Sequence, residues 1–190
     1  GGLARHQTIT DDGFALVVCH EVGHHIGGAP KKGGWIGGNK WASNEGQADY
    51  FATLKCLRKT FRGETTPELV AKLDVPAEVS KKCAEQFSGK TDQLLCQRGA
   101  MAGMSTARLF QELRRQTTLP DFSTPDSNTV SRTNHNHPET QCRLDTYYAG
   151  ALCSIDENVD VDQEDEAVGV CYRTSGDSHG TRPLCWFKPQ

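Results

Sequence analysis

Two histidines and a glutamate within residues 17–28 have the types and spacing of a metal site. His20 and His24 are separated so that, in a helix, both imidazoles project from the same face, one turn apart. Two imidazole nitrogens can then bind the same ion, with Glu21 beside them. This arrangement, HExxH, is typical of a zinc site in which the glutamate acts on water as a general base. The stretch therefore predicts a zinc site on a helix.

A catalytic zinc ion takes three protein ligands and leaves its fourth position to water, so a third ligand must follow. A histidine at position 30 would supply it in one class of zinc peptidase, but the chain has Pro30 there. The segment at 44–49, NEGQAD, offers Glu45 and, one helical turn later, Asp49 on the same face. We predict that Glu45 completes the zinc shell. Asp49 is expected to accept a hydrogen bond from a zinc-binding histidine and so fix its tautomer.

A third polar segment, HPETQCR at 137–143, follows an irregular connection over residues 117–136 that is rich in Thr, Ser, Asn, Asp and Pro. Pro138 suits the first position of a helix. Long loops in compact domains often line functional sites. This placement makes His137 and Arg143 further candidates for the site.

Taken in order, the HExxH, NExxxD and HP-x4-R motifs resemble those of the gluzincin peptidases. The motifs occur in the same order in one gluzincin family, that of the CAAX prenyl endopeptidases, the bacterial heat-shock membrane endopeptidase and several periplasmic quality-control peptidases, and the chain resembles this family over roughly residues 2–150. This resemblance implies an endopeptidase with one zinc ion per chain and a protein or peptide substrate. It also implies that His137 and Arg143 contact the substrate or stabilise the oxyanion. The family's transmembrane helices have no counterpart here, and at most the last of its strands remains.

In the expected mechanism, zinc polarises the scissile carbonyl and lowers the pKa of water, while Glu21 takes a proton from that water and passes it to the departing amine. Two alternatives stay open. The first is a catalytically inactive, disulfide-stapled module that binds zinc or a peptide. The second is a metal-dependent hydrolase that acts on other bonds. The intact Glu21 and the open fourth position favour the peptidase, because structural zinc sites are normally closed by four ligands.

The composition excludes several classes of partner. The chain has 21 Lys and Arg against 24 Asp and Glu, a net charge of −3, so no basic surplus points to nucleic acid or an anionic membrane. No apolar run approaches the roughly 18 residues that a transmembrane segment needs. Its 190 residues suffice for one substantial core. Because the chain begins with Gly1 rather than Met, we expect a processed product.

The eight cysteines are scattered and lack the CxxC spacing of metal sites. This pattern favours a disulfide framework and an oxidising compartment, so the expected location is periplasmic or secreted. The alternative is a cytosolic protein with buried free thiols. Cys142 and Cys153 fall about three turns apart on one expected helix, so each needs a partner elsewhere.

Two disulfides are suggested by turns in the sequence. Cys83 and Cys96 are nearly symmetric about the turn at 88–90, where a disulfide would join two antiparallel helices. Cys171 and Cys185 flank a second turn and are predicted to staple a hairpin.

The expected fold is mainly α, within the α+β class. It is a zincin-like helical metallopeptidase core with a short N-terminal edge strand in residues 1–9 and a small disulfide-stapled C-terminal hairpin. Residues 1–153 are expected to form the zinc metallopeptidase domain. Residues 154–190 would add an acidic loop and a cysteine-stapled extension packed on the same domain.

The first motif helix is expected to be capped by Thr10 and Asp11 or Asp12, and the second by Ser43, because these residue types suit the N-cap position. A long helix is predicted over residues 91–116. The Gly-rich loop between the motif helices carries Trp35 and Trp41. These two side chains would either roof the cleft and pack on a substrate or fill the underside of the loop.

Overall fold

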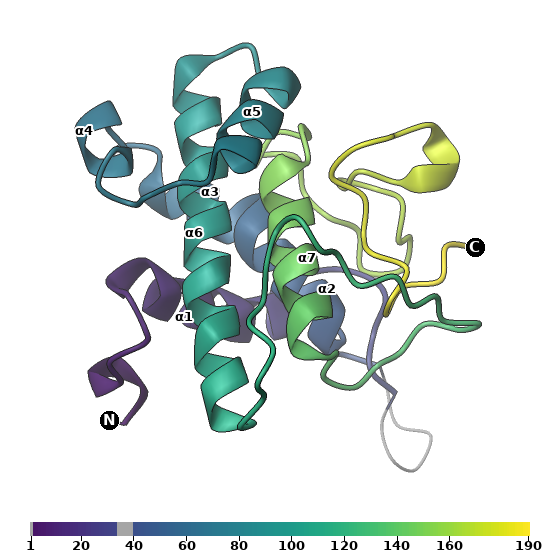
Figure 1. The fold of residues 1–190 in the computed structure, drawn as a ribbon. Helices are drawn as coiled ribbons and strands as arrows, with labels where there is room; N and C mark the ends of the chain where they lie inside the picture. Colours follow the sequence, from purple (N-terminus) through teal and green to yellow (C-terminus); the bar gives the residue numbers. More distant parts are fainter. Residues whose placement is uncertain (1, 34–39) are drawn as a thin grey trace.

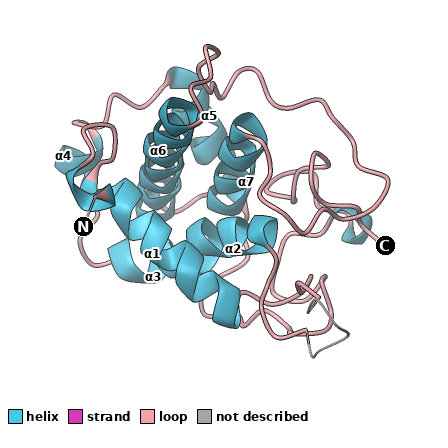
Figure 2. Ribbon diagram, turned by 90° about the horizontal axis from the view of Figure 1, so that it is seen from below, coloured by secondary structure: helices cyan, strands magenta, loops and turns pink. Residues whose placement is uncertain are grey.

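The computed structural model describes residues 2–33 and 40–190, and within them every regular element is helical, with no β-strand (Figures 1 and 2). The elements are η1 (Leu3–Arg5), α1 (Asp11–Ile26), α2 (Glu45–Phe51), η2 (Ala52–Cys56), α3 (Leu57–Phe61), α4 (Pro67–Val70), α5 (Ala77–Gln86), α6 (Lys90–Leu113), α7 (Thr140–Leu152) and η3 (Arg173–Ser175). η1 and η3 are 3-10 helices, and η2 is a π-helical turn that continues α2 into α3. The structure is therefore mainly helical, as predicted.

The long helix α6 runs through the middle of the molecule, with α7 packed along it (Figure 1). α1 crosses α6 and also packs on α2, which the view from below shows beside it (Figure 2). α4 and α5 pack on α6 as well. Apart from η3, the C-terminal segment after α7 has no regular elements and winds past α7 (Figure 1).

α1 begins where its sequence predicts and ends before two glycines. The Thr10 side chain accepts a hydrogen bond from the amide of Gly13 at 3.0 Å and so caps the helix. At the other end Gly28 has φ +82°, a left-handed conformation that glycine adopts without strain. The buried face of α1 includes His20. Another face is exposed, although it carries four large apolar side chains: Phe14, Val18, Val22 and Ile26.

α1 and α2 come into close contact where Gly23 meets Ala48. A Cβ atom on Gly23 would lie 2.9 Å from the carbonyl oxygen of Ala48 and 3.0 Å from its Cα, closer than real side chains approach. The missing side chain therefore permits this contact. His20 and His24 flank Gly23 on α1, so the contact holds both histidines against α2.

Three clusters of buried apolar side chains hold the helices together. One lies among α5, α6 and α7 and includes Leu144. A second joins α2 and α7 to the C-terminal segment and includes Trp186. The third lies between α1, η2, α3 and α6 and includes Leu16. The motif helix and its neighbours are thus anchored to separate parts of the core.

All eight cysteines are paired, as Cys19–Cys56, Cys83–Cys96, Cys142–Cys185 and Cys153–Cys171. The predicted Cys83–Cys96 bond is confirmed. The predicted bond between Cys171 and Cys185 is wrong, because each of these cysteines bonds to a different end of α7. Four disulfides indicate a protein suited to an oxidising compartment. None of the helices in the described residues combines the length and apolar character that crossing a bilayer requires.

The N-terminal edge strand is not formed. Within the predicted stretch 1–9, Leu3–Arg5 is a 3-10 helix instead. The amide of Arg5 donates to the carbonyl of Gly2 at 3.2 Å, and that of His6 donates to the carbonyl of Leu3 at 3.0 Å. Local hydrogen bonds thus take the amides that a strand would offer to a neighbour, so the zincin-like core with its edge strand is not confirmed.

The predicted C-terminal hairpin is not formed either, because residues 154–190 contain no β-strand. The amide of Ala167 donates to the side chain of Asp165 at 2.8 Å, and the amide of Tyr172 donates to that of Asp177 at 2.8 Å. Aspartate side chains therefore take backbone donors that a β-ladder needs, and the chain forms turns instead.

The C-terminal segment is packed into the body of the protein through Trp186, which is fully buried. Its ring lies directly against Gly46 in the first turn of α2, and its Nε1 donates to Thr146 Oγ1 on α7 at 2.9 Å. The space for the indole exists only because Gly46 lacks a side chain. The segment therefore supports α2 beside its first residue, Glu45.

Gly46→Ala tests this packing. Helix propensity alone would favour alanine by about 1 kcal/mol. The added methyl group would overlap the buried ring of Trp186, so we expect a net loss of about 1–3 kcal/mol. Urea unfolding measures the change, with Gly63→Ala as the control, because a Cβ there meets nothing within 4 Å. An unfolding midpoint for Gly46→Ala at or above that of the unmodified chain would contradict the packing.

Candidate metal centre

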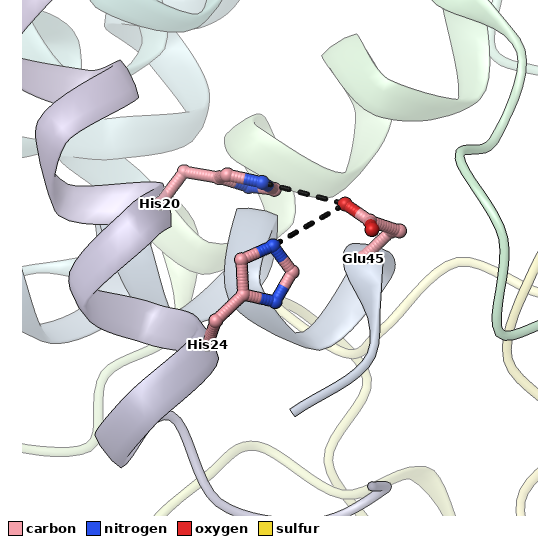
Figure 3. A group of neighbouring side chains, drawn as sticks. All are labelled: His20, His24 and Glu45. Atoms are coloured by element: carbon pink, nitrogen blue, oxygen red, sulfur yellow. Dashed lines mark ion pairs between the residues drawn. The ribbon is translucent and has the colours of Figure 1, made fainter. Parts of the chain in front are cut away.

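His20, His24 and Glu45 meet at the junction of α1 and α2 (Figure 3). His20 Nε2 and His24 Nε2 each lie 3.4 Å from the same carboxylate oxygen, Glu45 Oε2. One ligand atom from each residue lies within 4.8 Å of the other two. Two atoms that bind a tetrahedral zinc ion at about 2.1 Å are separated by about 3.4 Å. The spacing of the three predicted ligands therefore fits one ion between them.

The tautomers of both histidines follow from their second ring nitrogens. His24 Nδ1 lies 2.8 Å from the carbonyl oxygen of Ser43, which can only accept a hydrogen bond. His20 Nδ1 lies 2.7 Å from Asp49 Oδ1, a carboxylate oxygen. Each Nδ1 therefore carries a proton, and each Nε2 is directed at Glu45.

Glu45 Oε2 itself is buried and forms no hydrogen bond of normal geometry within the described part of the chain. Two Nε2 atoms and one carboxylate oxygen thus converge, and all three carry lone pairs. Such acceptors approach one another only with a cation between them, either a proton or a metal ion. Two imidazoles with one carboxylate are also a donor set that catalytic zinc uses. The residues present therefore fit the predicted ion.

The start of α2 is set by Asn44, not by Ser43 as predicted. Asn44 Oδ1 accepts the amide of Gln47 at 2.8 Å and caps the helix. Ser43 is occupied elsewhere: its amide donates to the carbonyl of His24 at 2.9 Å, and its hydroxyl donates to that of Gly28 at 2.7 Å. Ser43 therefore joins α2 to the end of α1 and places Glu45 in the first turn, beside the histidines.

Asp49 connects the site to α7. It is fully buried, and besides contacting His20 it accepts two hydrogen bonds from Arg143, from Nε at 2.8 Å and from Nη2 at 2.7 Å. The Arg143 guanidinium also lies over the ring of Phe110, at 4.1 Å from its centroid. The structure therefore places Asp49 as predicted, beside a histidine of the motif. It places Arg143 on Asp49, in the interior, where only 4% of the residue is exposed.

These charges shift several pKa values. Burial by itself would lower the pKa of His20, but the carboxylates of Asp49 and Glu45 outweigh it and raise the pKa to about 9. Burial would raise the pKa of Glu45, yet the imidazoles of His20 and His24 hold it far below its ordinary value. Asp49 is fully buried, but Arg143 and His20 lower its pKa to about 2. Both carboxylates are therefore anions at neutral pH, and each faces at least one imidazole of the motif.

His137 reaches the site from the irregular segment before α7. Its Nδ1 lies 3.2 Å from Glu45 Oε2, and more than half of its side chain is exposed. The segment is fixed nearby, because the Asn44 side chain contacts His135 Nδ1 at 3.2 Å and the amide of Asn134 donates to the carbonyl of Trp186 at 2.8 Å. The structure thus brings His137 to the edge of the predicted zinc shell.

Glu21 follows His20 on α1 and is exposed to solvent. Farther along α1, the His25 ring lies 5.2 Å from that of Trp41, and 62% of Trp41 is exposed. Trp35, the other tryptophan predicted to roof the cleft, lies outside the described residues. α1 therefore carries an exposed acid directly after His20 in the sequence and an exposed His25 that packs on Trp41.

Three residues that surround Glu45 were not predicted from the sequence. Asn44 caps its helix, Gln47 Nε2 donates to the carbonyl of Gly27 at 2.7 Å, and Lys32 Nζ lies 3.4 Å from Glu45 Oε1. The Asn44 cap was visible in the sequence as an alternative to Ser43. The contacts of Gln47 and Lys32 depend on how the chain returns after α1, and no spacing in the sequence signals them.

Comparison with protein-family models, with curated proteins and with solved structures found no match to this chain.

Asp49→Ala tests the link between α2 and α7. It would leave the Arg143 guanidinium buried without its partner, so we expect a loss of about 3–5 kcal/mol in unfolding free energy. Because His20 would lose its orienting carboxylate, zinc affinity should also fall, by about 10–100-fold. Urea unfolding and competition with a chromophoric chelator measure the two effects.

Asp12→Ala is the matched control, because Asp12 forms a similar two-bond pair with the buried Arg98, at 2.8 Å for each bond. Removing the Asp12 carboxylate should lower the free energy of unfolding while leaving zinc affinity unchanged. Equal zinc affinities in both variants would show that Asp49 has no orienting role.

Proposed function

We propose that this chain is a zinc-dependent endopeptidase of the gluzincin type, with His20, His24 and Glu45 as zinc ligands and Glu21 as the general base. One observation carries the proposal. Two imidazole nitrogens lie at the same 3.4 Å from one buried carboxylate oxygen, Glu45 Oε2, which forms no hydrogen bond of normal geometry within the described residues. Three ligands with a fourth position free is the arrangement of catalytic zinc.

Zinc bound there would polarise a scissile carbonyl and lower the pKa of water. The remaining tasks belong to the protein. Glu21 is exposed beside His20, so its carboxylate is available to a water molecule at the solvent side of the site. It would accept the proton of the attacking water and return it to the departing amine. Asp49 would hold the His20 ring in the orientation that catalysis needs.

His137 and Arg143 take different roles in this proposal. Burial lowers the pKa of His137, despite the nearby Glu45, so its imidazole is neutral at pH 7 and can donate a hydrogen bond to a substrate carbonyl or an oxyanion. Arg143 is buried and bonded to Asp49, so it acts on the site through Asp49 and His20 and does not touch the substrate.

A second candidate function rests on the position of His137. Its Nδ1 lies as close to Glu45 Oε2 as the nitrogens of His20 and His24 do, at 3.2 Å. If His137 were a fourth ligand, the zinc site would be closed, as structural zinc sites are. The protein would then be a catalytically inactive, disulfide-stapled module that binds zinc or a peptide.

Glu21→Gln tests the peptidase. The amide cannot accept a proton, so hydrolysis should be lost, while zinc should stay stoichiometric because Glu21 is not a ligand. Elemental analysis gives the zinc content, and mapping of new N-termini on a denatured protein substrate shows whether peptide bonds are cut. His25→Ala, a neighbouring exposed change, should keep both zinc and hydrolysis. Full hydrolysis by Glu21→Gln would end the mechanism, and loss of zinc from it would refute the ligand assignment.

His137→Ala separates the two candidates. In the peptidase, zinc affinity should stay within about threefold, and kcat should fall by about 100-fold because an oxyanion donor is lost. In the closed module, zinc affinity should fall sharply. Chelator competition and peptide hydrolysis, measured on the same preparation, distinguish these results.

A further inference from the structure

The two carboxylate oxygens of Glu45 have different surroundings. Oε2 faces His20, His24 and His137 and is buried. Oε1 lies 3.4 Å from Lys32 Nζ, within hydrogen-bonding distance. We propose that Lys32 is a positioning residue: by donating to Oε1, it restricts Glu45 to binding the ion through Oε2 alone. This inference rests on the proposed zinc site and names a determinant of its geometry.

The backbone holds Lys32 opposite the start of α2. Its amide donates to the carbonyl of Ala42 at 2.7 Å, and next to this bond Lys31 and Ser43 form an antiparallel bridge. The amide of Asn44 donates to the carbonyl of Pro30 at 3.0 Å. Residues on both sides of Lys32 are thus paired with the segment that enters α2, so its position relative to Glu45 is set by backbone contacts although its side chain is half-exposed.

The neighbouring lysine shows that this placement is particular to Lys32. Lys31 Nζ donates to the carbonyl of Trp41 at 3.1 Å and to the side chain of Gln163, away from Glu45. The two lysines have the same chemistry and adjacent positions, yet only Lys32 approaches the candidate ligand. Lys31 is therefore a matched control.

A carboxylate can bind a metal ion through one oxygen or through both. Binding through both oxygens of Glu45 would raise the coordination number and crowd the position that water needs. An ammonium group at Oε1 opposes this, because it forms a charge-assisted hydrogen bond with that oxygen and is repelled by a divalent cation. Lys32 would thus keep the site four-coordinate.

The pair is a weak source of stability. Ion pairs with an exposed member contribute little, because solvent screens them and ordering a long side chain has an entropic cost. A contribution to folding stability therefore does not account for the contact between Lys32 and Glu45. Replacing Lys32 should instead change how the ion is coordinated.

Cobalt substitution measures this coordination without any need for hydrolysis. Co²⁺ replaces Zn²⁺ in such sites, and four-coordinate cobalt absorbs visible light several-fold more strongly than five-coordinate cobalt. The full chain, Lys32→Met, Lys32→Arg and Lys31→Met would each be loaded with one equivalent of Co²⁺. We expect strong four-coordinate spectra from the full chain, from Lys31→Met and from Lys32→Arg, which keeps a donor for Oε1. Lys32→Met should show a several-fold weaker spectrum while still binding one equivalent.

The outcomes separate this inference from the proposed function. A Lys32→Met spectrum equal to that of the full chain would overturn the role of Lys32 and leave the zinc site standing. The same loss in Lys31→Met, or no rescue by Lys32→Arg, would also overturn it, since the effect would then not depend on a donor at Oε1. A full chain that binds neither Co²⁺ nor Zn²⁺ would refute the proposed function itself, and the inference with it.

Discussion

The candidate site depends on one buried carboxylate. Asp49 has no exposed surface, and its charge is balanced by Arg143 and by the His20 imidazole, whose Nδ1 lies 2.7 Å from Asp49 Oδ1. A buried anion without such partners would cost several kcal/mol, so α1, α2 and α7 must hold the positions that satisfy it. These helices come from distant parts of the chain. Charge compensation at Asp49 therefore aligns the motif helix with the helix that carries Glu45.

The C-terminal segment reinforces this arrangement. Disulfides attach it to both ends of α7, at Cys142 and Cys153, and the buried Trp186 fills the space above Gly46 in the first turn of α2. The carbonyl of Trp186 also accepts the amide of Asn134. One irregular segment thus supports the helix of Glu45 and the loop that brings His137 to the site. An irregular segment can support these elements because disulfides and a buried indole hold it in place, as the hydrogen-bond ladder of a β-strand otherwise would.

Features that depend only on residues close together in the sequence were predicted correctly. The helical spacing of His20 and His24 and the turn between Cys83 and Cys96 fix their geometry over short distances, and the structure agrees with both. Predictions failed where the outcome depends on distant partners. The strands at both ends gave way to local hydrogen bonds, and Cys171 and Cys185 each bond to α7 instead of to one another. The burial of Arg143 likewise follows from the packing of α7 on α2, which no motif spacing encodes.

The charges around the ligands bear on what a metal ion there would do. Asp49 is neutralised by Arg143, and Glu45 Oε1 is approached by Lys32, so each carboxylate near the ion has its own cation. Once an ion takes the place of the Nε2 protons, the histidines contribute neutral imidazoles, and a divalent ion would keep most of its positive charge. That charge would be available to a carbonyl oxygen that becomes negative in the transition state, in a setting where solvent screens it less than in bulk water. Arg143 and Lys32, which do not bind the ion, would therefore strengthen its effect as an electrophile.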